Sequence, residues 1–301
     1  MKVLITGASG FLGRHVLHSL RQRGIDTVLL GRQPSADPQA TAWIAADLLA
    51  SPDWATLMEH AQATHLLHLA WYAEHGRYWA SPLNLRWVDA TVRLTEAFCQ
   101  AGGQRVVVAG TCAEYDWSHG YCREETTPLH PATLYGVAKD ATRRLVMAVC
   151  QQHQMPCAWG RVFLPFGSGE SPQRLIPSLI AALRGQRAPF GVNASAYRDF
   201  LHASDVAEGL VTLLEPGAQG AYNISSGQPV QLQALVRQLA KLLHADPAPL
   251  LALASERPGE PALLAGESLR LQTLGWRPVL TLLQALNQAI NRPSQTEDFV
   301  S

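Results

Sequence analysis

Short apolar segments alternate with longer amphipathic segments through the first half of this chain, and this alternation restricts the fold more than any other feature. Apolar residues recur at helical spacing within the longer segments, as Leu12, Val16 and Leu20 do in the first of them. Strands that alternate with helices form a parallel sheet that helices cover on both faces. We therefore predict an α/β fold built on a doubly wound parallel sheet.

The predicted elements divide the chain into two parts. We expect strands at residues 2–6, 27–30, 42–46, 65–69, 105–109 and 156–161, and helices at 11–23, 54–62, 83–100 and 134–152. Prolines and glycines become frequent after Phe163, where we expect helices at 174–183, 205–214, 231–243 and 281–290 and a loose polar end at 292–301. Residues 1–163 should form the main domain, to which some later segments return, and residues 164–301 should form mainly a smaller substrate-binding lobe.

A glycine-rich turn joins the first strand to the first helix. Gly7, Gly10 and Gly13 are spaced GxxGxxG. Free backbone N–H groups and the positive end of the helix dipole meet at such a turn, where they can hold a pyrophosphate. Gly7 would allow the tight turn, Gly10 the close approach of the phosphate, and Gly13 the packing of helix on strand. A glycine triplet alone also fits an ordinary turn, but strand, turn and helix together predict a Rossmann-type dinucleotide-binding domain.

The residues that follow the second and third strands bear on the identity of the cofactor. Arg32 stands where a fold that selects NAD presents an acidic residue to the ribose hydroxyls, and an arginine there suits the 2′-phosphate of NADP. A solvated surface arginine is the other interpretation. Asp47 could accept a hydrogen bond from the adenine amine or cap a helix. We expect NADP as the cofactor, with NAD as the alternative.

Three residues form a candidate catalytic group. Tyr135 and Lys139 are four residues apart near the start of a predicted helix and so share one face. An ammonium group beside a phenol stabilises the phenolate and lowers the pKa of the tyrosine from about 10, so the pair can exchange a proton with a carbinol or a ketone. Thr111 follows an apolar strand, at the edge where ligands of open sheets bind, and could share the substrate oxygen. The alternatives are a helix-surface pair and, for Thr111, a turn residue that bonds its own backbone.

With these motifs the chain resembles the extended short-chain dehydrogenases/reductases, in the branch of nucleotide-sugar epimerases, dehydratases and 4-reductases. The matching segments are residues 6–13, 68–70, 198–207, 222–227 and 274–278, together with Thr111, Tyr135 and Lys139, so the resemblance covers nearly the whole chain. The cofactor-binding residues that it implies are Gly7, Ser9, Gly10, Phe11, Leu12, Gly13, Arg32, Asp47, Leu48, Leu69, Ala70, Tyr135 and Lys139.

The resemblance also implies a site for a nucleotide-diphosphate sugar. Family members hold the diphosphate with arginines in the segments that match Arg198 and Arg257, and guanidinium groups suit phosphate oxygens. An ion pair with Asp199 or Asp205 is the alternative for Arg198. We also place Cys112 among the residues that contact the substrate.

Departures from the family pattern narrow the chemistry. The sugar 4,6-dehydratases carry an Asp-Glu pair after the catalytic threonine, because elimination of water needs a further acid and base. Cys112 and Ala113 occupy those positions, so we do not expect dehydration, and Glu114 would face the other way if the segment continued as a strand. Two asparagines of the family are Leu164 and Trp87 here. Aromatic residues expected to border the pocket, as stacking platforms or as packing, are Trp71, Tyr72, Trp79 and Trp117.

Two activities fit these residues. A 4-reductase transfers a hydride from NADPH to C4 of a nucleotide-linked 4-keto-6-deoxy sugar, and Arg32 favours this activity because net reduction uses an exchanging cofactor. An NAD-dependent nucleotide-sugar 4-epimerase oxidises C4 and reduces it again from the other face. Reduction of a ketone without a nucleotide, and a non-catalytic NADP-sensing protein, are further alternatives.

Composition limits the partners. Lys and Arg number 24 and so do Asp and Glu, so no broad field favours nucleic acid or an anionic membrane. The five cysteines show no zinc-ligand spacing, which predicts no metal site and a reduced, cytoplasmic protein. A strand follows Met1 almost at once and no apolar run approaches about 18 residues, so we expect neither a signal peptide nor a membrane span. The resemblance implies a homodimer that pairs through helices 83–100 and 134–152.

Overall fold

The central element is a parallel sheet of seven strands. The computed structural model describes residues 1–32, 42–255 and 259–291. The strands of the large sheet are β1 (Lys2–Thr6), β2 (Asp26–Gly31), β3 (Trp43–Ala45), β4 (His65–His68), β5 (Arg105–Thr111), β7 (Cys157–Val162) and β11 (Gly220–Ile224), and every pairing between them is parallel. Their order is β11-β7-β5-β4-β1-β2-β3. The order reverses at β1, and ligands of such sheets bind at the carboxyl ends of the strands around that point.

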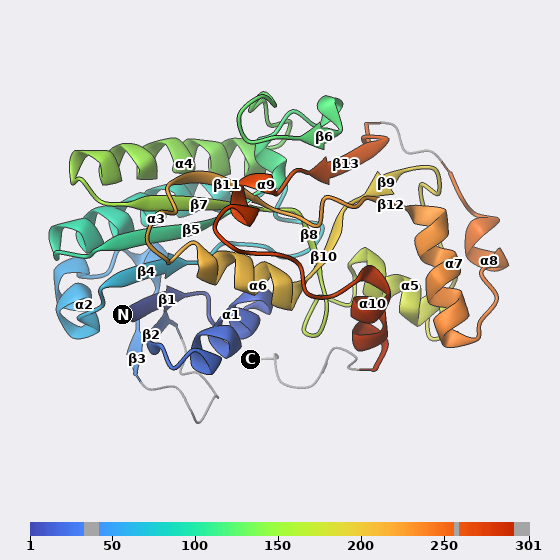
Figure 1. The fold of residues 1–301 in the computed structure, drawn as a ribbon, viewed down its shortest axis with the longest axis horizontal. Coiled ribbons are helices and arrows are strands. Elements are labelled where there is room, and N and C mark those ends of the chain that lie inside the picture. The colour runs from blue at the N-terminus through green and yellow to red at the C-terminus, as the bar shows by residue number, and fades with distance from the viewer. Residues whose placement is uncertain (33–41, 256–258, 292–301) are drawn as a thin grey trace.

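Helices cover both faces of this sheet (Figure 1). One face packs on α1 (Phe11–Gln22) and α6 (Ala203–Thr212), and the other on α2 (Trp54–Ala61), α3 (Leu83–Gln100) and α4 (Leu134–Gln152). Successive side chains of β1 point to opposite faces of the sheet. Val3 and Ile5 pack in the apolar core under α1 and α6, and Leu4 packs in the core under α2, α3 and α4. All three are fully buried, as expected for a parallel sheet covered on both sides.

A second group of elements lies beyond the carboxyl ends of the large sheet (Figure 1). It contains the strand pair β8 (Leu164–Phe166) and β10 (Phe200–His202), and a four-stranded sheet of β12 (Val230–Gln231), β9 (Tyr197–Arg198), β13 (Leu263–Gly266) and β6 (Tyr121–Cys122). Its helices are α5 (Leu175–Leu183), α7 (Leu232–Leu243), α8 (Ala248–Leu251) and α10 (Leu282–Asn291), while α9 (Leu269–Gln272) lies against β11. Apolar side chains such as Phe166, Leu235 and Leu286 give this group a core of its own.

The predicted α/β class is confirmed, and the predicted strands and long helices are present with ends that differ by up to two residues. The helix predicted at 205–214 begins earlier, at Ala203, because the His202 side chain caps it by accepting a hydrogen bond from the Ser204 N–H. The sequence analysis placed residues 222–227 in a motif but did not predict β11, which extends the large sheet. The tail predicted to be loose, residues 292–301, lies outside the described residues, and the proposed domain boundary remains a prediction.

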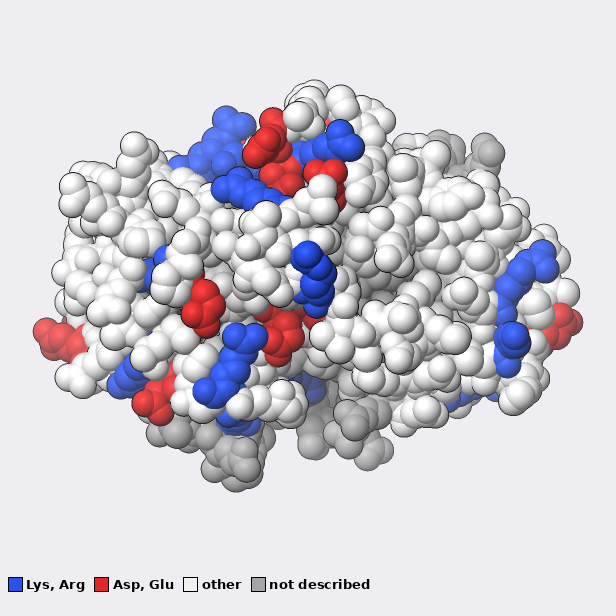
Figure 2. All heavy atoms as spheres, viewed as in Figure 1, with Lys and Arg blue, Asp and Glu red and all other residues white. Residues whose placement is uncertain are grey.

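Charged side chains of both signs lie intermixed on the face that Figure 2 shows. This distribution agrees with a formal net charge of zero. A surface of this kind attracts no ligand by long-range steering, so an anionic ligand has to be recognised by local groups.

Candidate active site

The glycine turn after β1 has the geometry of a phosphate-binding turn. Gly7 has a φ of +74°, and a Cβ atom there would lie 2.8 Å from the backbone nitrogen of Ala70. A Cβ atom at Gly13 would overlap the carbonyl oxygen of Gly7. Helix α1 begins at Phe11, and its N-cap Gly10 offers no side-chain cap. The backbone N–H groups at the start of α1 therefore have no side-chain cap, and the turn fits the diphosphate of a dinucleotide.

The other predicted cofactor residues lie at the carboxyl ends of neighbouring strands. Leu69 and Ala70 follow β4, and their N–H groups donate to the carbonyl and the hydroxyl of Thr6 at 3.1 Å and 3.3 Å. Arg32 is exposed directly after β2. Asp47 caps the short helix η1 (Leu48–Ala50) by accepting from the Leu49 N–H at 2.9 Å, which is the capping role that the sequence left open. Ser9 is exposed, whereas Leu48 is buried.

The structure brings Thr111, Tyr135 and Lys139 together. Thr111 is the last residue of β5, and Tyr135 and Lys139 lie on the first turns of α4. The Tyr135 phenol is close enough to Thr111 for the threonine to influence its pKa, and Lys139 Nζ donates to the Ala109 carbonyl oxygen at 3.0 Å. Thr111 Oγ1 accepts from the Ala113 N–H at 3.2 Å, which is the local turn bond that the sequence offered as the alternative. The catalytic role of Thr111 stays a prediction.

Burial has the largest influence on the titrating groups of this site. It raises the pKa of the Tyr135 phenol, against the hydrogen bond with Thr111, and it lowers the pKa of Lys139 to about 7, against the Glu114 carboxylate. Burial also lowers the pKa of His68 to about 3, and this imidazole bridges the hydroxyls of Thr6 and Thr91 at 2.7 Å and 2.9 Å. The spacing of Tyr135 and Lys139 predicts only the attraction between phenolate and ammonium, whereas the cost of burying both groups depends on the fold around them.

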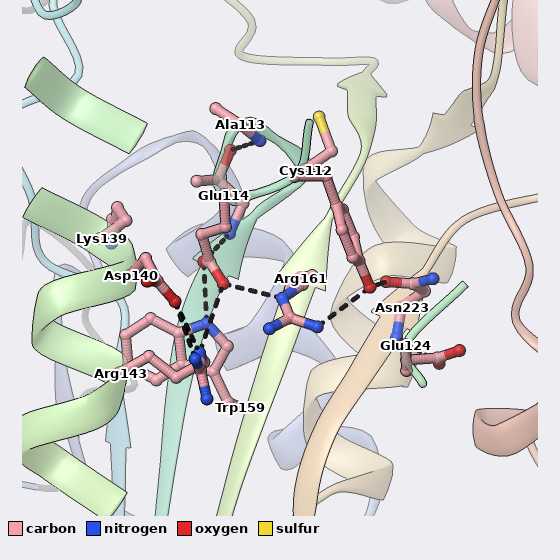
Figure 3. A network of polar contacts seen from close by, with 12 residues as sticks. Cys112, Ala113, Glu114, Glu124, Lys139, Asp140, Arg143, Trp159, Arg161 and Asn223 are labelled. Carbon is pink, nitrogen blue, oxygen red and sulfur yellow. Dashed lines mark hydrogen bonds and ion pairs between the residues drawn. The ribbon is translucent and has the colours of Figure 1, made fainter. Parts of the chain in front are cut away.

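Glu114 has a structural partner that the sequence did not reveal (Figure 3). The chain leaves the strand after Thr111 and forms the short helix η2 (Cys112–Glu114), which turns the Glu114 side chain back under β5. Its Oε1 accepts from the Thr111 N–H and from Trp159 Nε1, each at 2.8 Å. Its Oε2 accepts from Arg161 Nε at 2.8 Å. This fully buried carboxylate is therefore the counter-ion of a buried guanidinium group and an anchor for Thr111.

Aromatic rings surround Tyr135. Tyr78, Trp79 and Trp71 contact its ring edge to face, with centroid distances of 4.8 Å, 5.7 Å and 6.4 Å. Trp117 packs edge to face on Trp79. The hydroxyl of Tyr72, another predicted pocket residue, donates to Glu74. Of these rings the sequence analysis missed Tyr78, although it lies next to Trp79 in the same loop.

Of the two arginines predicted to bind the substrate, the structure describes only Arg198. Arg198 is buried, and its Nη1 donates to the carbonyl oxygens of Tyr197 and Pro261 at 2.8 Å. Its Nη2 lies 3.4 Å from Glu260, so its acidic partner is neither of the aspartates considered from the sequence. Those aspartates accept hydrogen bonds from backbone N–H groups of other segments, Asp199 from Gly227 and Gly266 and Asp205 from Val279 and Leu280. Arg257 lies outside the described residues.

Cys112 lies in η2, directly after Thr111, and is buried. Burial raises the pKa of its thiol, so the group is a neutral side chain at ordinary pH and no nucleophile. Within the described part of the chain, no cluster of three His, Cys, Asp or Glu residues could hold a metal ion. No helix among these residues is both long and apolar enough to cross a membrane.

Sheet, glycine turn and the Thr111, Tyr135 and Lys139 group together define a Rossmann-type oxidoreductase that uses a nicotinamide dinucleotide. The chain belongs to the NAD dependent epimerase/dehydratase family, whose model matches residues 3–225. Its relatives in this family are nucleotide-sugar enzymes.

Sequence relatives include a dTDP-D-glucose 4,6-dehydratase of Mus musculus, 23% identical over 96% of this chain and 87% of the relative. A UDP-glucose 4-epimerase of Azospirillum brasilense is 27% identical over 92% of this chain and 87% of the relative. Among solved structures, MoeE5 in complex with UDP-glucuronic acid and NAD has a TM-score of 0.84 and 30% identity, and the match covers 97% of this chain and 98% of MoeE5. The alignment of nearly whole chains agrees with one common architecture.

Proposed function

We propose that this enzyme reduces C4 of a nucleotide-linked 4-keto-6-deoxy sugar. The observation that carries the proposal is the position of Tyr135, at the start of α4 beside the carboxyl end of β5 and among aromatic rings, where burial raises the pKa of its phenol. A reduction consumes one hydride and one proton, and a protonated phenol beside the substrate oxygen is the form that can deliver the proton. Epimerisation begins with an oxidation, which requires the phenolate as a base.

The residues of the site then have distinct roles. NADPH, when bound, supplies the hydride. The N–H groups at the start of α1 hold its diphosphate, and Thr111 and Tyr135 hold the C4 oxygen of the sugar. Tyr135 donates its proton to this oxygen as the C4–H bond forms, which leaves an alcohol and a phenolate. The Lys139 ammonium stabilises that phenolate.

The residues after Thr111 make dehydration a poor fit. Cys112 carries a thiol whose pKa is raised by burial, and Ala113 has no functional group. Glu114, the nearest carboxylate in the sequence, is fully buried and bound to Arg161. A 4,6-elimination needs a further acid and base at the sugar, and these side chains do not supply them.

We further propose NADP as the cofactor, on the basis of Arg32. This arginine is exposed after β2, where its guanidinium group can pair with a 2′-phosphate. The relative MoeE5 has been crystallised with NAD, so NAD is the alternative. Arg32→Asp should lower the ratio of kcat/KM for NADPH to that for NADH about tenfold or more, because one charge-assisted contact contributes about 1.5–3 kcal/mol. An unchanged ratio would exclude Arg32 as the selecting residue.

A 4-epimerase is the second candidate, and the Azospirillum UDP-glucose 4-epimerase favours it. One experiment separates the two candidates. The enzyme is incubated with NADPH and dTDP- or UDP-linked 4-keto-6-deoxyglucose, and in parallel with dTDP-glucose or UDP-glucose without added reductant. Loss of NADPH absorbance in proportion to the alcohol formed supports the reductase. Inversion at C4 without net redox change supports the epimerase instead, and tight NADP binding without either reaction would indicate a sensor.

We also propose a homodimer that pairs through α3 and α4. These two helices lie side by side on one face of the large sheet (Figure 1). Each exposes apolar side chains, Leu85 on α3 and Val137 and Leu145 on α4. Exposed apolar residues on neighbouring helices are typical of a surface that a partner covers, and sedimentation velocity of the wild type and of Leu145→Glu tests it.

A further inference from the structure

The ammonium group of Lys139 has an aromatic partner. Lys139 Nζ lies 3.9 Å from the centre of the Trp71 ring. An ammonium group over the face of an indole is attracted by the quadrupole of the ring, and the attraction is stronger where water is excluded. Lys139 is buried, so the attraction between its ammonium group and the indole is of the stronger, desolvated kind.

Contacts that do not involve Lys139 fix the orientation of Trp71. Its Nε1 donates to Asn84 Oδ1 at 2.8 Å. Asn84 is fully buried, and its Nδ2 donates to the carbonyl oxygens of Tyr78 and Ser81 at 2.7 Å and 2.9 Å. On α3 the Trp87 ring stacks on the Trp71 ring, with centroids 6.0 Å apart. The indole face is therefore held in place by the start of α3 and by the loop before it.

We propose that Trp71 is a positioning residue for the reaction, whose indole face keeps Lys139 charged and aimed at the site of Tyr135. The inference rests on the role proposed above for Lys139. The titratable groups that interact with Lys139 are His68 from β4 and Glu114 from η2, and Tyr135 lies one helical turn before it on α4. His68 is neutral above pH 4, and the charge of Glu114 is shared with Arg161. Two neutral groups thus offset the burial of the ammonium group, the Ala109 carbonyl oxygen, which accepts its hydrogen bond, and the Trp71 indole, which lies under its charge.

The chain allows a direct test, because it contains only three lysines, Lys2, Lys139 and Lys241. Protein labelled with 13C at the lysine ε-carbon gives three signals, and the spectrum of Lys139→Met identifies the one that belongs to Lys139. Trp71 is replaced by tryptophan carrying one to four fluorine atoms, which weakens the ring quadrupole with little change of shape. The pH at which the Lys139 signal titrates in cofactor-free protein should fall stepwise, by about one pH unit for the most fluorinated ring.

The same series at Trp79 is the matched control. That ring also packs on Tyr135, but within the described residues no cation lies over it. Fluorination at position 79 should leave the Lys139 titration unchanged. A Lys139 signal that titrates at one pH throughout the Trp71 series, in spectra that are otherwise native, would overturn the inference.

Enzyme kinetics separate this inference from the proposed function. If both hold, the pH at which kcat/KM declines on the alkaline side moves in parallel with the Lys139 signal. If the signal moves while the kinetic profile stays in place, the contact with Trp71 is supported and the role of Lys139 in the reaction fails.

Discussion

Burial acts in opposite directions on the pKa values of the two titrating residues at the site. It raises the pKa of Tyr135 and lowers that of Lys139 to about 7, because a low-dielectric environment disfavours phenolate and ammonium alike. Near neutral pH the tyrosine is therefore protonated, while Lys139 is close to the midpoint of its titration. Activity that depends on the ammonium group should consequently decline as the pH rises through neutrality.

Removal of the phenolic hydroxyl tests the residue on which the proposed reaction depends. Tyr135→Phe should lower kcat about 100-fold or more, because the proton donor is lost while the ring still packs against Tyr78 and Trp79. The dissociation constant of NADP, measured by calorimetry, should change little. A variant that turns over at the wild-type rate would remove Tyr135 from the mechanism.

The residues of the site that lie close together in the sequence could be predicted, whereas the side chains that distant segments bring to the site could not. Tyr135 and Lys139 could be predicted as neighbours because four residues make one helical turn. The ring of Trp71 over Lys139 could not, since it depends on how the loop after β4 meets α4. The environment of Glu114 was missed because the chain turns into a short helix after Thr111, whereas the prediction assumed a strand.

Among the elements, the β1–turn–α1 unit could be predicted most completely. Steric constraints require Gly7 and Gly13, and for Gly13 these constraints are local in sequence, whereas Gly7 contacts Ala70. Strands such as β6, β9 and β12 were not predicted, because each has two residues and so shows no alternation of side chains. Their pairing depends on segments far apart in the chain, as between β6 and β13.

A methyl group at Gly13 should push helix α1 away from the glycine turn that follows β1. In Gly13→Ala the new Cβ atom would overlap the Gly7 carbonyl oxygen, so α1 has to shift away from the turn. We expect the free energy of unfolding to fall by about 1–3 kcal/mol and cofactor binding to weaken, as measured by urea denaturation and calorimetry. Gly31→Ala is the stability control, because no atom lies within 4 Å of the Cβ position there. Equal stability of the two variants would contradict the steric argument.

At the scale of the whole molecule, the large sheet takes strands from both halves of the sequence. β11 pairs with β7, and α6 packs beside α1 on the sheet, although both come late in the chain. The division into domains stays a prediction, and the pairing partner of β11 could not be predicted from local patterns. Which strand pairs at the edge of a sheet depends on all the other strands of the chain, so it is not determined by the residues of one segment.

Stability of the folded protein should depend on pH through His68. This histidine is buried, and its pKa is lowered from 6.5 to about 3. Between these values the unfolded chain binds a proton that the folded protein does not, so the free energy of unfolding falls as the pH is lowered, by on the order of 1 kcal/mol per pH unit. His68→Gln, whose amide can bridge the same two threonines, should show a shallower decline from pH 6.5 to 4.5 in urea denaturation. Parallel declines would contradict this assignment.

The pairing of Glu114 with Arg161 has a consequence for how the enzyme could be redesigned. A carboxylate only three residues from Thr111 looks like a ready source of acid–base catalysis for expelling a hydroxyl group from the sugar. If Glu114 took part in catalysis, the guanidinium group of Arg161 would be left buried without its counter-ion. Breaking such a buried pair costs about 3–5 kcal/mol of folding free energy. An engineer who wanted a dehydratase would therefore introduce new acids at positions 112 and 113 and leave Glu114 untouched.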